Sequence, residues 1–216
     1  AGSSYRRGGY GVRMAAADTD RLRQIVWDRF GKPRRTLLHG QSWGGNVAAK
    51  ASELYAVGAD GGRNYDGVLL TNGVLAGGTQ AYGFRADLRA VYQFYCRNHP
   101  RDSEAAYPVW QGLPQNGSMS RAELADRVQT CTGVGLDPAQ RSPEQSSRLR
   151  NILSVIDISE DQLVSHLAWA TTLFQDLIWQ RLDGRNPFSN IGTTYQGSDN
   201  DAALNAGVER FAADPL

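Results

Sequence analysis

One segment constrains the fold of this chain more than any other, because it joins two apolar runs through a serine flanked by glycines. The run Arg35–His39 precedes Gly40-Gln41-Ser42-Trp43-Gly44, and an Ala-rich stretch over residues 46–57 follows. A short apolar run without polar alternation predicts a strand covered on both faces. Glycines two positions before and after the serine suit a sharp turn in which neighbouring backbones approach too closely for a Cβ atom. We therefore predict a strand, a tight turn at Ser42 and a helix.

The predicted turn has the pattern G-x-S-x-G, and its surroundings suit a nucleophile. We expect the turn to project Ser42 Oγ away from the sheet. The helix that begins at Trp43 would direct its amino-terminal N–H groups and the positive end of its dipole toward the serine. An oxyanion formed there would accept a hydrogen bond from the Trp43 N–H. Gly-rich structural turns can show the same five letters, and the flanking strand and helix are what favour a nucleophile.

Other apolar patterns place further elements along the chain. A helix is expected over residues 18–30 and a second strand over Gly67–Thr71, so strand, helix and strand form a right-handed parallel crossover. From residue 79 onward, helical patterns alternate with polar loops. Capping-box spacings begin at Ser120, Ser142 and Ser159, and each predicts a helix start. A last short helix is expected over residues 201–213.

The segment around Ser42 resembles the nucleophile elbow of the α/β-hydrolase superfamily, and residues 3–10 look like the strand end and loop that lie upstream of it. The resemblance implies an α/β fold: a hydrolase core of parallel sheet and flanking helices over residues 1–78, a helical cap or lid inserted over 79–200, and a return segment to the core over 201–216. It also implies that Ser42 is the nucleophile, that Trp43 supplies an oxyanion amide and that Gln41 lines the substrate pocket. The letters Gln-Ser-Trp-Gly-Gly are similar both to esterase elbows and to those of proline-specific aminopeptidases.

A serine nucleophile also needs a general base, normally a histidine that an acid orients. His39 precedes the turn on its strand and should point away from Ser42 into the helix layer, while His99 and His166 have the settings of structural histidines. The second strand is not followed by an acid, and only two clear strands are present. We therefore expect the chain to be the middle part of a longer hydrolase. Its acid and histidine, and further strands of the sheet, would come from missing segments of the same precursor or from a second chain.

These observations favour a serine hydrolase that cleaves carboxylic esters, small or polymeric, through an acyl-enzyme on Ser42. A proline-specific-type aminopeptidase of the same fold is the first alternative. Esters are preferred because no acidic cluster in residues 79–200 is obviously placed to hold a free amino terminus. The missing base motivates a second alternative, a non-catalytic subunit that has kept the turn and lost the triad.

Charge and composition exclude several other classes. The 216 residues contain 23 basic and 22 acidic side chains, a formal net charge of +1 without a long run of one sign. This balance argues against a nucleic-acid-binding protein and against a polybasic membrane anchor. No apolar stretch approaches the roughly 18 residues of a membrane span. The three histidines lie far apart and no phosphate-cradling loop follows a strand, so no metal and no organic cofactor are expected.

The two cysteines bear on the compartment. A bridge between Cys96 and Cys131 would stabilise the fold by about 3–4 kcal/mol, and it would place the protein outside the cytosol; two reduced thiols are the alternative. Only Lys32 and Lys50 are lysines among the 23 basic residues, a bias typical of GC-rich bacterial genes. We therefore expect a secreted or periplasmic bacterial protein, whose export signal has already been removed.

Overall fold

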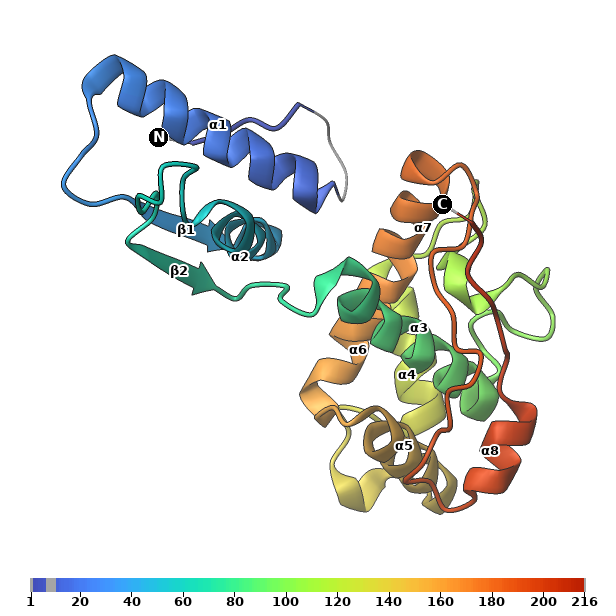
Figure 1. The fold of residues 1–216 in the computed structure, drawn as a ribbon. Coiled ribbons are helices and arrows are strands. Elements are labelled where there is room, and N and C mark those ends of the chain that lie inside the picture. The colour runs from blue at the N-terminus through green and yellow to red at the C-terminus, as the bar shows by residue number, and fades with distance from the viewer. Residues whose placement is uncertain (1, 7–10, 216) are drawn as a thin grey trace. The chain divides into compact units, whose positions relative to one another are not determined.

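The computed structural model describes residues 2–6 and 11–215 and divides the chain into two compact units. Unit 1 comprises Ala1–Ala81 and unit 2 comprises Tyr82–Leu216 (Figure 1).

Unit 1 is built around one parallel crossover. Its elements are α1 (Val12–Phe30), β1 (Leu37–Gln41), α2 (Trp43–Tyr55) and β2 (Gly67–Thr71). The two strands pair in parallel, from Leu37 opposite Gly67 to Gln41 opposite Thr71. The predicted succession of strand, helix and strand is confirmed, and Ser42 lies between β1 and α2.

Small side chains hold unit 1 together. Helix α2 packs on both strands and against α1. Alanines dominate these contacts, so the helices approach each other and the sheet closely. The buried core of unit 1 consists of Ala15, Ala16, Leu38, Val47, Ala48, Ala51 and Tyr65.

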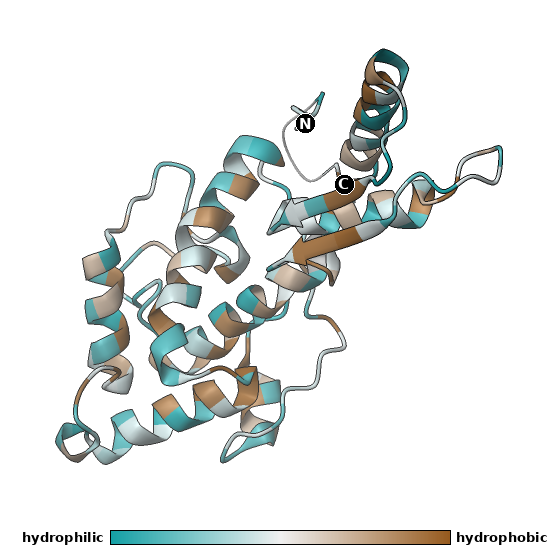
Figure 2. Cartoon of the chain, turned by 90° about the vertical axis from the view of Figure 1, so that its left-hand side faces the viewer, coloured by the Kyte–Doolittle hydropathy of each residue, from teal (hydrophilic) through white to brown (hydrophobic). Residues whose placement is uncertain are grey.

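Only one face of the two-stranded sheet is covered within unit 1. Along β1, Leu38 and Gly40 are buried, whereas the alternate residues are exposed. Leu37 is 69% exposed and Leu69, on the same face of β2, is 62% exposed. Figure 2 shows the hydrophobic character of both strands. The prediction of strands covered on both faces is therefore wrong for unit 1.

The predicted fold class is also wrong. The chain is 53% helical, and its described residues form a single sheet of two strands. This is a helix-rich structure and not an α/β-hydrolase core with a multi-stranded sheet and a cap. The expected strand end near residues 3–10 does not form over residues 2–6, and residues 7–10 lie outside the described part of the chain. A tight turn with its crossover requires only two strands, so the pattern around Ser42 does not determine the size of the sheet.

The named elements of unit 2 are all helical, and loops without regular structure join them. Helix α3 begins before the unit boundary and enters unit 2, and short 3₁₀ and π-helical segments interrupt the later helices. The elements are α3 (Gly77–Cys96), η1 (Val109–Gln111), α4 (Arg121–Thr132), η2 (Pro138–Gln140), α5 (Pro143–Ile156), α6 (Glu160–Ala168), η3 (Trp169–Leu173), α7 (Phe174–Asp176), η4 (Leu177–Arg181) and α8 (Asp201–Gly207).

The three predicted helix starts are confirmed. Ser120 Oγ accepts a hydrogen bond from the Glu123 N–H at 3.0 Å. At Ser142 and Ser159 the reciprocal capping box is complete, with a glutamine side chain returning to the cap backbone. Helix α8 is shorter than predicted and ends at Gly207. Beyond it, the Asn190 side chain bonds the backbone of Glu209 and Phe211, and these bonds replace helical ones.

One hydrophobic core and a disulfide stabilise unit 2. The core takes residues from α3 through to the carboxyl-terminal segment and includes Leu88, Tyr92, Leu167, Phe174 and Phe211. The predicted bridge between Cys96, at the end of α3, and Cys131, in α4, is present. No helix in residues 2–6 and 11–215 combines the length and apolar content needed to cross a bilayer.

We predict that replacing both cysteines by alanine lowers the free energy of unfolding of unit 2 by about 4 kcal/mol. The bridge closes a segment of 35 residues, and opening it restores that much chain entropy to the unfolded state. Urea denaturation of the oxidised protein and of the double variant measures the difference. Equal unfolding free energies would show that the bridge does not restrict the unfolded chain.

Candidate functional site

The backbone at Ser42 has an unusual conformation. Its φ is 52° and its ψ is −123°, a region that non-glycine residues rarely occupy. Holding an L-residue there costs about 1–3 kcal/mol, so the surrounding structure must impose it. Such strain is concentrated at functional sites, and the hydroxyl is the only functional group of the Ser42 side chain.

Three backbone hydrogen bonds impose this conformation. The Ser42 N–H donates to Thr71 O at 2.9 Å, which ties the turn to the end of β2. The Ser42 carbonyl accepts from the Gly45 N–H at 2.9 Å and from the Val74 N–H at 3.2 Å. The turn is therefore anchored to the first turn of α2 and to the segment that follows β2.

Close backbone packing also shapes the turn. A Cβ atom on Gly40 would lie 2.0 Å from the carbonyl oxygen of Gly44, and one on Gly45 would lie 2.7 Å from Gly73 Cα. A Cβ atom on Gly44 would meet no atom within 4 Å. The predicted need for glycine at position 40 therefore has a clear structural basis. The need predicted at position 44 is not present there but at its neighbour Gly45.

The start of α2 creates a favourable field for an anion beside Ser42. The helix has 13 residues, and the Ser42 side chain makes no capping hydrogen bond to it. The Ser42 hydroxyl is thus not used as a cap, and the residue is exposed. The positive end of the helix dipole lies at this residue. Trp43 packs its ring edge-to-face against Tyr5, with 5.3 Å between the ring centres.

Gln41 and His39 lie on the uncovered face of the sheet. Both side chains alternate with the buried residues of β1, and both residues are exposed. His39 Nε2 lies 3.2 Å from Thr71 Oγ1, a residue of β2 on the same face. The prediction that His39 points into the helix layer is therefore wrong, and its described hydrogen bond is made to a threonine hydroxyl and not to Ser42.

His99 is a buried structural residue of unit 2. Its Nε2 lies 2.8 Å from Thr171 Oγ1, and its Nδ1 lies 2.9 Å from Tyr107 Oη. The Thr171 hydroxyl donates its proton to Leu167 O, so it must accept from a protonated His99 Nε2. Burial, together with two arginines nearby, lowers the pKa of His99 far below its ordinary value. The ring is neutral and both of its nitrogens are engaged.

His166 lies on α6 and also favours the neutral form. Its ring packs edge-to-face against Phe84, with 5.2 Å between the ring centres. Partial burial and the positive charge of Arg85 lower the pKa of His166. Both His99 and His166 belong to unit 2, whereas Ser42 belongs to unit 1.

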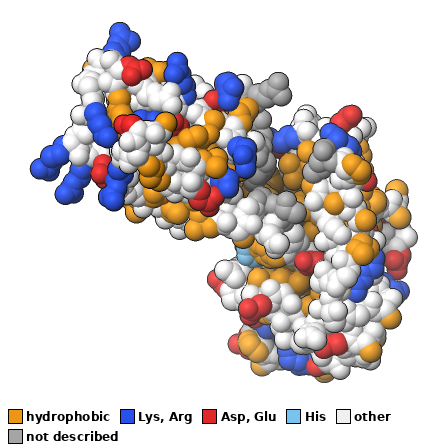
Figure 3. All heavy atoms as spheres, in the orientation of Figure 1, with side chains coloured by type: hydrophobic (Ala, Val, Ile, Leu, Met, Phe, Trp, Pro, Cys, Tyr) orange, Lys and Arg blue, Asp and Glu red, His pale blue; other side chains and the backbone are white. Residues whose placement is uncertain are grey.

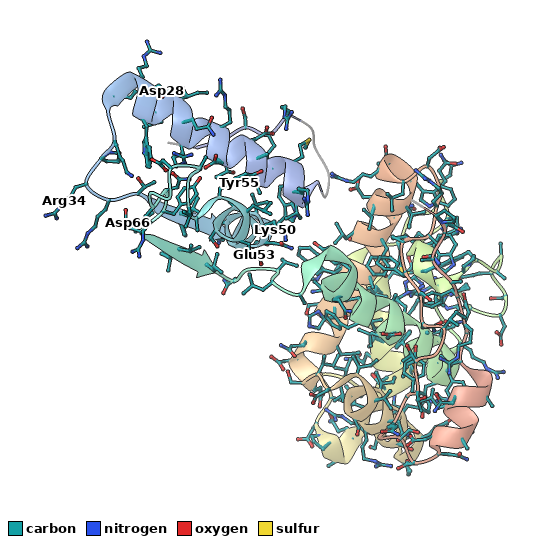
Figure 4. The ribbon with its side chains drawn as sticks, in the orientation of Figure 1. Asp28, Arg34, Lys50, Glu53, Tyr55 and Asp66 are labelled. Atoms are coloured by element: carbon teal, nitrogen blue, oxygen red, sulfur yellow. A yellow bond between two sulfur atoms is a disulfide. The ribbon has the colours of Figure 1, made fainter. Side chains whose placement is uncertain are left out.

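Asp66, the acid that directly precedes β2, lies at the end of the sheet opposite to Ser42. Its carboxylate accepts a hydrogen bond from the Thr36 N–H at 2.7 Å, before β1 begins. Figure 4 shows Asp66 and Arg34 at the end of the sheet where the two strands start. Ser42 follows the other end of β1, so Asp66 does not orient a base for it.

The balanced net charge of the chain conceals a difference between its units. Unit 1 has 11 basic and 6 acidic side chains, a formal net charge of +5, while unit 2 has 12 basic and 16 acidic ones, a net charge of −4. Lysine and arginine side chains stand out across the surface of unit 1 in Figure 3. The net positive charge of unit 1 produces a field that favours negative charge on this unit.

The described part of the chain contains no group of three or more His, Cys, Asp or Glu side chains that could hold a metal ion. Comparisons with models of protein families, with curated proteins and with solved structures give no match to this sequence. The functional interpretation therefore depends on the geometry of the turn.

Sequence reasoning missed the residues that hold the turn from outside the five-letter pattern. Gly73 allows the close approach of Gly45, while Thr71 and Val74 supply the backbone bonds. Two signals were present in the sequence: the second glycine after Trp43, and the Asn72-Gly73 pair directly after β2. Each marks a place where two backbones meet or where the chain turns.

We predict that Gly40→Ala destabilises unit 1 by more than about 3 kcal/mol, because the new Cβ atom would overlap the Gly44 carbonyl. Gly44→Ala is the matched control, with open space for its methyl group and helical backbone. It should leave the free energy of unfolding unchanged or raise it by up to about 1 kcal/mol. Denaturation of both variants tests this, and equal stabilities would contradict the described packing.

We predict that His99 makes unit 2 less stable in acid. A histidine with a depressed folded-state pKa stabilises the fold above its unfolded-state pKa, and that stability is lost as the pH falls below about 6.5. The loss is about 1.4 kcal/mol per pH unit in this range. Unfolding free energies of wild type and His99→Gln between pH 8 and pH 5.5 isolate the effect. Parallel pH profiles would show that His99 accepts a proton in the folded state.

Proposed function

We propose that the chain carries the nucleophile of a serine hydrolase that cleaves carboxylic esters through an acyl-enzyme on Ser42. The observation that supports this most strongly is the positive φ of Ser42, imposed by three backbone hydrogen bonds and by the Gly40 and Gly45 contacts. A turn with only a structural task could place glycine there and avoid the strain.

In the proposed reaction, Ser42 Oγ attacks the ester carbonyl carbon and its proton passes to a general base. The carbonyl oxygen becomes an oxyanion, which the Trp43 N–H and the dipole of α2 stabilise. Collapse of this intermediate breaks the bond to the alcohol, which leaves with the proton from the base. Water then attacks the acyl carbonyl carbon and gives its proton to the same base. The bond to Ser42 Oγ breaks, the carboxylic acid leaves, and Oγ takes back a proton from the base. Gln41, directly before the serine, contacts the substrate.

The general base and its acid are proposed to come from outside these 216 residues, from the same precursor or from a second chain. His99 supports this, because both of its ring nitrogens are engaged within unit 2. The sheet supports it as well: its outer edges are unpaired in the described residues, and Leu37 and Leu69 are exposed. Further strands would pair these edges, and further elements packed on the sheet would bury the exposed face; either could bring a histidine to Ser42.

We further propose that the protein works in an oxidising compartment, outside the cell or in the periplasm. The support is the Cys96–Cys131 bridge, since disulfides persist where thiols are not kept reduced.

The first test is labelling of the complete assembly with a fluorophosphonate probe, followed by peptide mapping. An activated serine reacts, so the label is expected on Ser42 and absent from Ser42→Ala. Hydrolysis of p-nitrophenyl esters should fall at least about 10⁴-fold in the variant. Equal labelling or equal hydrolysis by Ser42→Ala would exclude Ser42 as the nucleophile.

A substrate panel separates the alternatives. The proposal expects p-nitrophenyl esters to be hydrolysed faster than aminoacyl p-nitroanilides at equal concentration. Faster cleavage of the anilides would replace the esterase by an aminopeptidase. A folded assembly that neither binds the probe nor cleaves either substrate would leave a non-catalytic subunit.

A further inference from the structure

Unit 2 contains a cavity of about 440 Å³. The segment before α4, helix α4 itself, the end of α6 and the π-helical segment η3 form its walls. The volume lies in the range of sites that take one small molecule. All residues that line the cavity belong to unit 2.

The wall of this cavity includes a rare backbone geometry. Residues Trp169–Leu173 form a π-helix, and a second π-helix follows over Leu177–Arg181. Such turns are energetically unfavourable in isolation and are often found at functional sites. Trp169, which η3 contributes to the cavity, is 53% exposed although it lies in an ordered helix. The Arg85 guanidinium lies over this ring, 5.8 Å from its centre, and the exposed remainder of the indole can contact a ligand.

Contacts with residues 112–117 hold the two π-helical segments and α7 in place. Gly112 approaches so closely that a Cβ atom would lie 2.2 Å from Thr171 O. Gln175 Nε2 donates to Pro114 O and to Gly117 O, at 2.8 and 2.7 Å. The Trp179 indole donates to Leu113 O at 2.9 Å. Because these bonds fix the π-helical segments, the cavity is formed before any ligand binds.

The inner wall offers few hydrogen-bond donors to a ligand. The Thr172 hydroxyl donates to Ala168 O, and the Ser165 hydroxyl donates to Gln162 O. Both protons are therefore used within the helix. The apolar part of the wall consists of the side chains of Met119, Leu124, Ala168, Trp169 and Leu173. The body of a ligand in this cavity must be apolar.

The charged residues of the lining indicate the sign of a ligand. Asp176 is paired with Arg181 at 3.1 Å, so its charge is compensated. Arg121 is exposed, and none of the ion pairs among the described residues includes it. A guanidinium beside an apolar cavity suits a carboxylate, which it can bind through two parallel hydrogen bonds.

We propose that this cavity binds a small organic carboxylate with an aromatic or branched apolar body. The body lies against Trp169 and the aliphatic side chains, and the carboxylate pairs with Arg121. The inference does not depend on the reactivity of Ser42, because it concerns unit 2 alone.

The test is titration of the full chain with 2-naphthoate, followed by calorimetry and by tryptophan fluorescence. One molecule should bind per chain, saturably, at millimolar or lower concentration. The uncharged 2-naphthamide should bind at least tenfold more weakly. Arg121→Gln should weaken naphthoate binding about tenfold and remove the preference over the amide. Arg34→Gln, which removes an exposed arginine of unit 1, is the matched control and should bind like wild type.

Two further variants keep the test decisive. Trp169→Ala should abolish binding, and Ala168→Phe should block the cavity while it leaves Trp169 and Arg121 in place. Circular dichroism and the unfolding midpoint verify that each variant is folded. The proposal is overturned if naphthoate does not saturate a single site, if the amide binds equally well, or if folded Ala168→Phe binds like wild type.

Discussion

The contact between the backbones of Gly40 and Gly44 is the constraint on which the structure of unit 1 depends. It brings the last residues of β1 against the first turn of α2, and a Cβ atom at Gly40 would lie only 2.0 Å from the carbonyl oxygen. Given this contact, the chain has too little space to pass from strand to helix through ordinary torsion angles. Ser42 makes the change of direction with a φ of 52°, and the hydrogen bond from its N–H to Thr71 O stabilises that torsion angle. The position of the hydroxyl is therefore a consequence of the backbone packing.

Unit 2 differs from unit 1 in that its core contains large buried polar side chains, among them Arg89 and His99. Arg89 is fully buried, and its guanidinium donates to His99 O at 3.0 Å and to Val109 O at 3.4 Å. Burial lowers the pKa of Arg89, and carbonyl oxygens replace water as partners of Nε and Nη2, while Nη1 has no hydrogen-bond partner among the described residues. His99 continues this network to Thr171, within the first π-helical segment. The polar network and the cavity wall thus share the same turn of helix.

Local signals in the sequence predicted the local structure well. The serine caps at residues 120, 142 and 159, the Cys96–Cys131 bridge and the crossover through α2 all follow from short-range chemistry and were confirmed. The fold class was wrong because a five-residue pattern specifies a turn and two strands, but not how many strands lie beside them. The role of Gly45 and the π-helical segments could not be predicted, since both depend on which backbones approach one another in three dimensions.

The crystal structure of the complete assembly with a phosphonate covalently bound at Ser42 would test the central claim most directly. The account predicts that φ of Ser42 stays near 52°, that the Ser42 N–H still bonds Thr71 O, and that a phosphoryl oxygen lies about 2.7–3.1 Å from the Trp43 N–H. A negative φ at Ser42, or a phosphoryl oxygen directed away from the start of α2, would contradict it.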